Sequence, residues 1–420
     1  MLVFKFGGAS VKDAKSVRNV ANILQRYQNE QILVVVSAMG KTTNLMESLV
    51  DAYINQKDFN SILDEVKSFH RKITQDLIGE NSQQFYEVEN LLIELECALD
   101  TDMLSNGYDF VYDQIVPYGE LISTRIISHF LNENDVTNRW LDARNFVVTS
   151  SDHRRARVDW DTTKNLISKR AKKLIEKQLT ITQGFIGRTI DNTTSTLGRE
   201  GSDYSAAIFA FCLDAASVTI WKDVPGVMNG DPKLLDNTTL LPDISFKEAI
   251  ELAYYGASVI HPKTIQPLLK KSIPLYVRSF VDEHAAGTIV QDHGLQNVVE
   301  VPCYIVKDNQ VMLSLSSKDF AFIVEDNLSH IFSALASSGI QINLMQNTAI
   351  SFTICVNNDA MRIDNFLSIV GETYLIEKTE KLKLLTVFNP SSDSNLSSIG
   401  EGKKVILEHR TQNALQVILQ

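Results

Sequence analysis

The stretch Thr196–Ala206 places two glycines, three charged side chains and a helix start next to one another. Gly198 and Gly201 allow backbone conformations in which successive N–H groups turn toward an anion. The apolar segment that follows predicts a buried helix whose N-terminus attracts phosphate or carboxylate, and the arginine suits a planar carboxylate. The alternative is a glycine loop whose serine and aspartate merely cap the helix. The candidate residues are Arg199, Ser202 and Asp203.

A lysine near the end of the first apolar strand is a second unusual feature. Leu2, Phe4 and Phe6 share one face by the two-residue period, so the lysine points to the other face, beside a glycine turn. Ligands of open α/β sheets bind at this end of the strands. We expect a phosphate-facing role, whereas the alternative is an edge-strand lysine kept for solubility. The candidate residues are Lys5, Gly7, Gly8 and Ser10.

Three more junctions between strands and helices carry polar side chains. The apolar run 32–36 ends in a turn rich in hydroxyl groups, and the segment 180–187 ends another strand. A helix that opens at Tyr118 carries a glutamate in its first turn, where the helix dipole favours a carboxylate. Capping alone is an equally open interpretation of that glutamate. The candidate residues are Ser37, Thr43, Glu120 and Phe185.

The loop from Lys222 to Lys233 follows a β-branched strand at 217–221. Proline and glycine predict an ordered loop there. Its place beyond the end of a strand favours a shelf for adenine and ribose over a linker. A single histidine before proline, His261, is typical of a structural role.

Composition narrows the class of protein. The chain has 420 residues, of which 44% are hydrophobic and 22% charged, so we expect two or three globular domains. A net charge of -11 without a basic cluster argues against a nucleic-acid partner. The four cysteines lack metal or redox spacing and indicate free thiols. The start lacks a leader pattern and no segment reaches membrane-spanning length, so we expect a cytoplasmic protein without a membrane partner.

The elements implied by these junctions follow one pattern. A strand, a glycine turn and a helix recur, which predicts a parallel sheet. The region from about 43 to 105 has helical periodicity without a chemical motif, and we expect a helical cover. From about 298 onward the order changes to β-α-β-β-α-β, with apolar residues such as Leu328, Ile331 and Leu335 at helical spacing.

Five motifs together resemble the aspartate kinases of the amino acid kinase superfamily. They stand in the family's order over about the first 290 residues, as Lys-Phe-Gly-Gly-Ala-Ser from Lys5, Val-Ser-Ala-Met-Gly from Val36 with Thr43-Asn44, Thr-Gln-Gly-Phe-Ile-Gly from Thr182, the stretch Leu197–Ala206, and the loop Asp223–Pro232. The resemblance implies a carbamate-kinase-like α/β three-layer sandwich with a mainly parallel eight-stranded sheet. It also implies ATP-dependent phosphorylation of the side-chain carboxylate of L-aspartate, the first step of lysine, threonine and methionine biosynthesis.

The same resemblance implies roles for the residues. Lys5 and the Gly7-Gly8 backbone would hold the transferred phosphoryl group, with Asp203 as their organiser. Substrate-binding residues would be Ser37, Thr43, Glu120, Phe185, Arg199 and Ser202. Phosphate- or nucleotide-binding residues would be Gly7, Gly8, Ser10, Lys222, Asp223, Met228, Asp231, Lys233 and Ser258. Mg²⁺ would be carried by the phosphates of ATP, without a dedicated protein metal site.

The chain departs from the family pattern at four positions. Glu200 replaces a glycine and must turn away from the anion site. Ser258 stands where a lysine is common, Lys222 stands where threonine is common, and Met228 takes an aromatic position. Glu200 and Ser258 motivate one alternative, which is a catalytically weak or silent amino-acid sensor. A second alternative is a related kinase that acts on glutamate, acetylglutamate or UMP.

The tail resembles ACT domains, the amino-acid-sensing modules of aspartate kinases. We expect a kinase domain over 1–295, an ACT domain over 296–380 and a partial second ACT domain over 381–420, without a fused homoserine dehydrogenase. ACT pairing implies a homodimer. The candidate effector residues are Ser317, Ser338 and Asn343. Because lysine-sensing relatives often carry acidic residues at the positions of both Asn343 and Ala349, we expect weak or absent lysine inhibition.

Overall fold

The computed structural model describes residues 1–420 except 81, 236, 258–259, 283, 295, 297, 320 and 391–403. The chain forms two compact units. The first consists of Met1–Val227, Leu240–Ile250 and Val259–Val298, and the second of Met228–Thr239, Glu251–Ser258 and Val299–Gln420. Each unit is described by itself.

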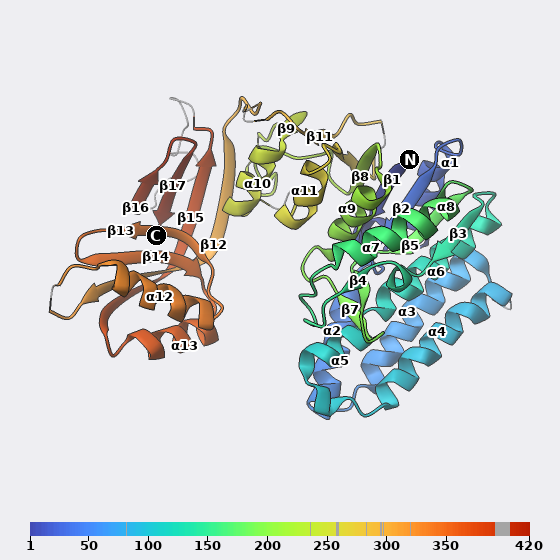
Figure 1. Cartoon of the computed structure of the whole chain (residues 1–420), viewed down its shortest axis with the longest axis horizontal. Coiled ribbons are helices and arrows are strands. Elements are labelled where there is room, and N and C mark those ends of the chain that lie inside the picture. Colours follow the sequence, from blue (N-terminus) through green and yellow to red (C-terminus); the bar gives the residue numbers. More distant parts are fainter. Residues whose placement is uncertain are drawn as a thin grey trace. The chain divides into compact units, whose positions relative to one another are not determined.

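An eight-stranded sheet forms the centre of the first unit (Figure 1). Its order is β3-β5-β2-β1-β8-β10-β11-β9, and every neighbouring pair is parallel except β10 with β11. All five residues of β2 are buried, as expected for a strand covered on both faces. The strands are β1 (Leu2–Phe6), β2 (Ile32–Val36), β3 (Asn138–Leu141), β5 (Leu179–Gln183), β8 (Ser217–Lys222), β9 (Asp243–Ser245), β10 (Leu275–Ser279) and β11 (Thr288–Gln291).

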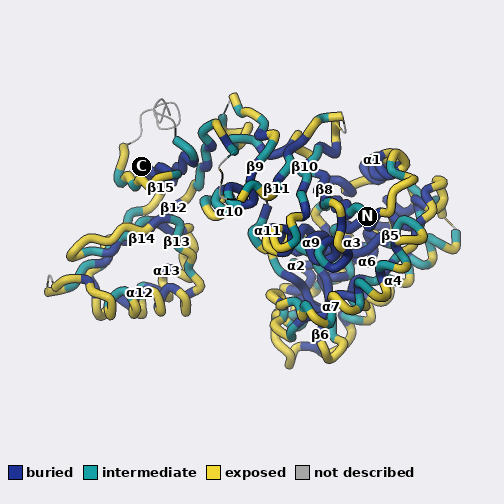
Figure 2. The backbone as a smooth tube through the Cα atoms, turned by 45° about the horizontal axis from the view of Figure 1, so that its top comes forward, coloured by how far each residue is buried: buried dark blue, intermediate teal, exposed yellow. Residues whose placement is uncertain are grey.

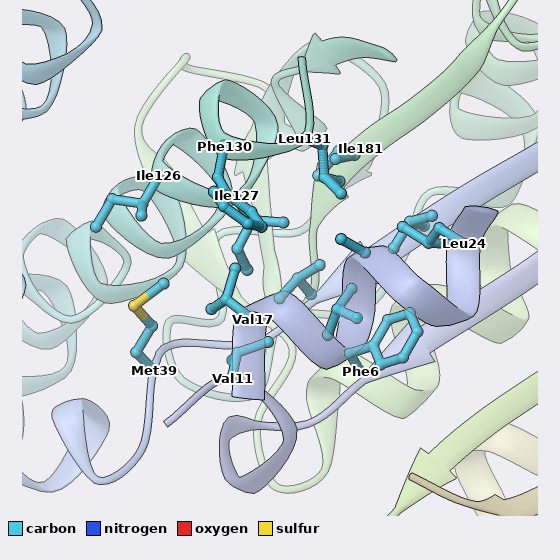
Figure 3. Close-up of a cluster of buried hydrophobic side chains, with 14 of the residues drawn as sticks. Phe6, Val11, Val17, Leu24, Met39, Ile126, Ile127, Phe130, Leu131 and Ile181 are labelled. Atoms are coloured by element: carbon cyan, nitrogen blue, oxygen red, sulfur yellow. The ribbon is translucent and has the colours of Figure 1, made fainter. Parts of the chain in front are cut away.

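Helices lie on both faces of this sheet, which confirms the expected three layers. The helices are α1 (Ala14–Gln25), α2 (Thr42–Ile54), α3 (Asn60–Ile78), α4 (Gln83–Asp100), α5 (Tyr108–Ile115), α6 (Tyr118–Glu133), α7 (Trp160–Leu166), α8 (Lys172–Ile175), α9 (Gly201–Leu213), α10 (Phe246–Tyr255) and α11 (Pro262–Leu269). On one face, α1 and α6 pack on the sheet through a cluster that includes Phe6, Val17, Ile127 and Phe130 (Figure 3). On the other, α9 packs against β1 and α11 and is buried along nearly its whole length (Figure 2).

The expected helical cover over 43–105 is present as α2, α3 and α4. The first unit also contains a small three-stranded sheet of order β4-β6-β7. It contains β4 (Val148–Thr149), β6 (Ile186–Thr189) and β7 (Thr194–Thr196). β6 and β7 form an antiparallel hairpin. The glycine loop begins directly after this hairpin, at the end of β7.

The second unit contains a six-stranded antiparallel sheet of order β13-β14-β12-β15-β17-β16. Its elements are β12 (Cys303–Ser317), α12 (Glu325–Ser337), β13 (Ile342–Asn347), β14 (Ser351–Asn357), α13 (Ala360–Val370), β15 (Tyr374–Phe388), β16 (Val405–Arg410) and β17 (Ala414–Leu419). This order confirms the predicted β-α-β-β-α-β pattern. Both α12 and α13 contribute to one apolar cluster with β12 and β14.

The strands β12 and β15 are long and run through both halves of this sheet. Their pairing shifts register between Lys307 and Met312, and Asn309 and Lys381 adopt positive φ angles there. Beyond that irregularity, the second half of β15 pairs with β17, and β17 with β16. The expected boundary at 380/381 therefore falls inside a single strand.

In the described part of the chain, no helix has the length and apolar character that a bilayer crossing requires. Among the described residues, Cys97 is exposed and the other three cysteines are buried, and none of the four forms a disulfide.

Candidate active site

Lys5 and Asp203 form a buried ion pair at the carboxyl end of β1. Asp203 lies in the first turn of α9, and the lysine Nζ is 2.6 Å from its Oδ1. Burial raises the pKa of the Asp203 carboxyl, but the positive charges of Lys5 and Lys222 outweigh burial and hold that pKa below its ordinary value. The aspartate is therefore ionised at neutral pH, and two lysines share one carboxylate.

The turns that follow β1 and β2 lie against each other. The N–H of Gly40 donates to the carbonyl of Gly8 at 3.0 Å. A Cβ on Gly8 would lie 2.8 Å from two carbonyl oxygens of the second turn, so a side chain does not fit there. A Cβ on Gly7 would lie 3.2 Å from the Nζ of the buried lysine. Ser10 closes the turn, because its Oγ donates to the carbonyl of Trp221 on β8 at 3.3 Å.

Glu120 is buried at the start of α6 and points at the turn after β2. Its Oε1 accepts from the N–H of Ala38 at 3.2 Å, whereas its Oε2 is buried without a hydrogen-bond partner. On the same helix, Ser123 donates to the carbonyl of Ser37 at 2.8 Å. Burial raises the pKa of Glu120 to about 8. A cation next to Oε2 would keep this carboxylate ionised at neutral pH. Thr43, half-buried in the first turn of α2, follows the same turn.

Phe185 and the start of α9 pack in close contact. A Cβ on Gly184 would lie 2.5 Å from the Cβ of Ser202. Phe185 adopts φ = 70°, and its N–H donates to the Oγ of Ser205 at 2.9 Å. Its carbonyl accepts from the N–H of Leu197 at 2.9 Å. The loop that carries Arg199 is thus held between the hairpin and the helix.

The helix cap differs from the expected one. Glu200 is the N-cap residue, with φ = 54° in the left-handed region and without a side-chain cap bond. Ser202 and Asp203 consequently fall inside the first turn, so the alternative interpretation, in which they merely cap α9, was wrong. Because the carboxylate of Asp203 does not cap the helix, it can pair with Lys5. The side chains of Arg199 and Glu200 are both exposed, so Glu200 turns outward as expected.

A model of the amino acid kinase family matches residues 1–279. Lysine-sensitive aspartokinase 3 of Escherichia coli (strain K12) is 31% identical over 413 residues, which cover 96% of this chain and 90% of that protein. This chain belongs to the aspartokinase family. A solved structure of E. coli aspartokinase III with aspartate and ADP has a TM-score of 0.84 at 28% identity, covering 100% of this chain and 96% of that one. The same enzyme with lysine and aspartate has a TM-score of 0.82 at 28% identity, covering 100% and 95%.

Within this aspartokinase fold, the predicted nucleotide loop is divided between the two units. Lys222 and Asp223 belong to the first unit with Lys5, whereas Met228, Asp231 and Lys233 belong to the second. Val227, at the boundary, donates its N–H to the Oγ1 of Thr288 at 2.8 Å. The Oδ1 of Asp231 accepts from the N–H of Lys233 at 2.9 Å. Ser258 lies outside the described residues. His261 caps α11 by accepting from the N–H of Lys263, which confirms its structural role.

The candidate effector residues lie on different elements of the second unit. The amide of Asn343 accepts from the Nζ of Lys307 at 2.8 Å and donates to Gln310 at 2.7 Å and to Asn357 at 2.9 Å. Its amide group therefore already has partners within this chain. Ser338 ends α12 and accepts from the amide of Asn365 at 3.4 Å, and Ser317 bonds to Asp319.

One buried charge near the site has no counterpart among the predicted residues. Asp113 on α5 is fully buried and bonds to Thr196, at the end of β7. The available signal was a lone aspartate within an apolar helical run, between Val111 and Val116. The partner is 83 residues away in the chain, so the spacing of residues did not reveal the contact.

Proposed function

We propose that this chain transfers the terminal phosphoryl group of ATP to the side-chain carboxylate of L-aspartate and forms 4-phospho-L-aspartate. The product is the first intermediate toward lysine, threonine and methionine. The Lys5–Asp203 pair carries the proposal, because a buried ammonium is fixed at the strand ends next to glycine turns. The solved complexes of E. coli aspartokinase III with aspartate, ADP and lysine support the choice of substrates.

Phosphoryl transfer requires positioning and charge stabilisation more than covalent chemistry from the protein. The positive charges of Lys5 and Lys222 both act on the carboxylate of Asp203. Positive charge at this place suits the phosphates of ATP, and it would stabilise the charge that develops on the transferred group. Gly7, Gly8 and Ser10 complete the phosphate side of the site in this proposal. Because the acceptor is a carboxylate, which is ionised at neutral pH, a general base is not required.

The aspartate would lie between Glu120 and Arg199. The unpartnered Oε2 of Glu120 is a buried acceptor that suits the substrate ammonium. Arg199 carries an exposed guanidinium, which suits the α-carboxylate. The remaining lining residues in this proposal are Ser37, Thr43, Phe185 and Ser202.

Nucleotide contacts would come from the loop after β8. We assign Asp223, Met228, Asp231, Lys233 and Ser258 to this role by their place in the family motif. Mg²⁺ would be held mainly by the phosphates of ATP.

The proposal extends to the organisation of the protein. We assign the kinase domain to 1–295 and an ACT-type regulatory region to 296–420, in which the expected parts 296–380 and 381–420 share the strands β12 and β15. We further propose a cytoplasmic homodimer that pairs through its ACT sheets and takes an amino acid near Ser317, Ser338 and Asn343. Self-complementary interfaces favour such dimers. Sedimentation at about micromolar concentration tests the pairing, which a monomeric mass would contradict.

A hydroxamate assay tests the reaction, since hydroxylamine traps acyl phosphates. We expect aspartyl hydroxamate from MgATP and L-aspartate, and far less product from D-aspartate, glutamate or acetylglutamate. Lys5→Ala should lower kcat by at least about a hundredfold, because the lost charge acts where charge develops. Lys15→Ala is the matched control, because Lys15 is exposed on α1. Absence of product from the wild type would favour the silent-sensor alternative, and product from another acid would favour a different substrate.

A further inference from the structure

Asp113 is a fully buried carboxylate that accepts hydrogen bonds from two separate segments of the chain. Its Oδ1 accepts from the hydroxyl of Thr196 at 2.6 Å, and its Oδ2 accepts from the N–H of the same residue at 3.1 Å. Oδ2 also bonds to Nδ1 of His153 at 2.9 Å and accepts from the N–H of Arg154 at 3.1 Å. One side chain thus joins α5, the end of β7 and the segment after β4.

The two segments that meet at Asp113 also contact each other. The N–H of Ala156 donates to the carbonyl of Thr196 at 3.1 Å. Gly198 has φ = 78°, and a Cβ there would lie 2.9 Å from the carbonyl oxygen of Arg154. The loop that carries Arg199 therefore starts from a fixed point and passes directly along the 153–156 segment.

The 153–156 segment is held in a conformation that its sequence does not favour. Arg154 has φ = 62°, in the left-handed region that favours glycine. Its guanidinium pairs with Asp109 at 2.9 Å and lies over the rings of Tyr108 and Tyr112, at 5.1 and 4.6 Å from their centroids. All three partners belong to α5. Strained backbone persists where surrounding contacts determine it, and such places concentrate at functional sites.

Helix α5 also leads directly to the opposite side of the proposed aspartate site. It ends at Ile115, and α6 begins at Tyr118 with Glu120 in its first turn. Asp113 thus lies on the helix that precedes Glu120, the proposed ligand of the substrate ammonium. It also binds Thr196, from which the loop with Arg199, the proposed ligand of the substrate carboxylate, begins. A shift at Asp113 would alter the spacing between the two.

We propose that Asp113 is a positioning residue that sets the aspartate affinity of the site by fixing the Arg199 loop against α5. This inference rests on the proposed function. Because Asp113 is fully buried and its hydrogen bonds go to Thr196 and the 153–156 segment, it would act through these two segments. It should influence aspartate binding much more than ATP binding, because the Lys5–Asp203 pair contacts neither segment in the described hydrogen bonds and ion pairs.

Asp113→Asn tests the proposal, because the amide keeps the shape but turns N–H groups toward the existing donors. We expect the KM for aspartate to rise about tenfold to a hundredfold, with the KM for ATP changed less than about twofold. Trypsin cleavage after Arg199, followed by mass spectrometry of the peptide that ends there, should accelerate at least about tenfold because the loop loses its anchor.

Two controls separate positioning from general destabilisation. Asp109→Asn removes an exposed partner of Arg154 and should leave the KM for aspartate and the cleavage rate within about twofold of wild type. Thr196→Ser keeps the hydroxyl bond and should behave as wild type, whereas Thr196→Val should reproduce Asp113→Asn. The Thr196 pair decides the matter if Asp113→Asn does not fold.

The proposal would be overturned if Asp113→Asn raised the KM for aspartate and the KM for ATP equally. It would also be overturned if this variant changed neither the KM for aspartate nor the rate of cleavage after Arg199. The cleavage measurement does not require turnover. If wild-type protein forms no aspartyl hydroxamate, the proposed function fails on that result, and the cleavage rates still decide whether Asp113 anchors the loop.

Discussion

Replacing Glu120 by glutamine should stabilise the protein at alkaline pH while it weakens aspartate binding. Glu120 is 2% exposed, and burial raises the pKa of its carboxyl group from the ordinary 4.5 to about 8. Because the folded-state pKa lies above the unfolded-state value, ionisation favours the unfolded chain. The stability of the wild type should therefore fall as pH rises from about 4.5 to about 8.

The size of this effect follows from the interval between the two pKa values. At about 1.4 kcal/mol for each pH unit, the complete interval corresponds to about 5 kcal/mol. Between about pH 6 and about pH 8, the free energy of unfolding of the wild type should fall by about 2 kcal/mol, whereas that of Glu120→Gln should not. For a unit of this size we expect the thermal midpoints to diverge by roughly 4 °C over that range.

Thermal unfolding in the absence of substrate measures this difference. Glu65→Gln is the control, because Glu65 is exposed on α3 and should follow the wild type at each pH. Parallel loss of stability in wild type and Glu120→Gln would refute the argument from burial. Glu120→Gln should also raise the KM for aspartate by about tenfold to a hundredfold, because an amide replaces the carboxylate that pairs with the ammonium.

Four further predictions follow from individual contacts. Gly184→Ala should lower the urea midpoint and the kinase rate, because its Cβ would lie 2.5 Å from that of Ser202; an unchanged midpoint would contradict the close approach. Glu200→Gly should raise the free energy of unfolding by about 1 kcal/mol, because glycine tolerates the left-handed conformation. A lower free energy of unfolding in a denaturant titration would contradict this prediction. Lys222→Thr should raise the KM for ATP about tenfold and leave the KM for aspartate unchanged. If initial-rate measurements give the variant the same KM for ATP as the wild type, Lys222 does not bind phosphate. Half-inhibition by lysine should require more than about 1 mM, because the amide of Asn343 is neutral and already bonded to Lys307; submillimolar inhibition in a rate titration would show that other groups supply the charge.

Much of the fold was predictable because local patterns determine it. The apolar run of β2 predicted a strand covered on both faces, and the apolar segment of α9 predicted a buried helix; both are observed. The Lys5–Asp203 pair brings together two of the predicted residues from motifs far apart in the chain. The resemblance to the aspartate kinases implied this association, whereas the glycine turns by themselves predicted only that anions would bind near each strand end.

The details that failed depend on long-range contacts and on single backbone angles. Serine and aspartate at 202 and 203 are common caps, yet the left-handed conformation of Glu200 moves the helix start forward and leaves them inside it. The partners of Asn343 come from other strands whose register is shifted by a bulge. Asp113 gained its role from a residue 83 positions away, which periodicity does not reveal.

The long strands β12 and β15 limit how this protein can be divided or recombined. Because the half with β16 and β17 also contains residues 303–307 of β12, which pair with residues 384–388 of β15, this half is not formed by one continuous stretch of sequence. A gene cut at residue 380 would divide β15 and leave unpaired strand edges on both products. The two halves should consequently be inherited, exchanged and unfolded as a single module, even though their sequence resembles two domains in series.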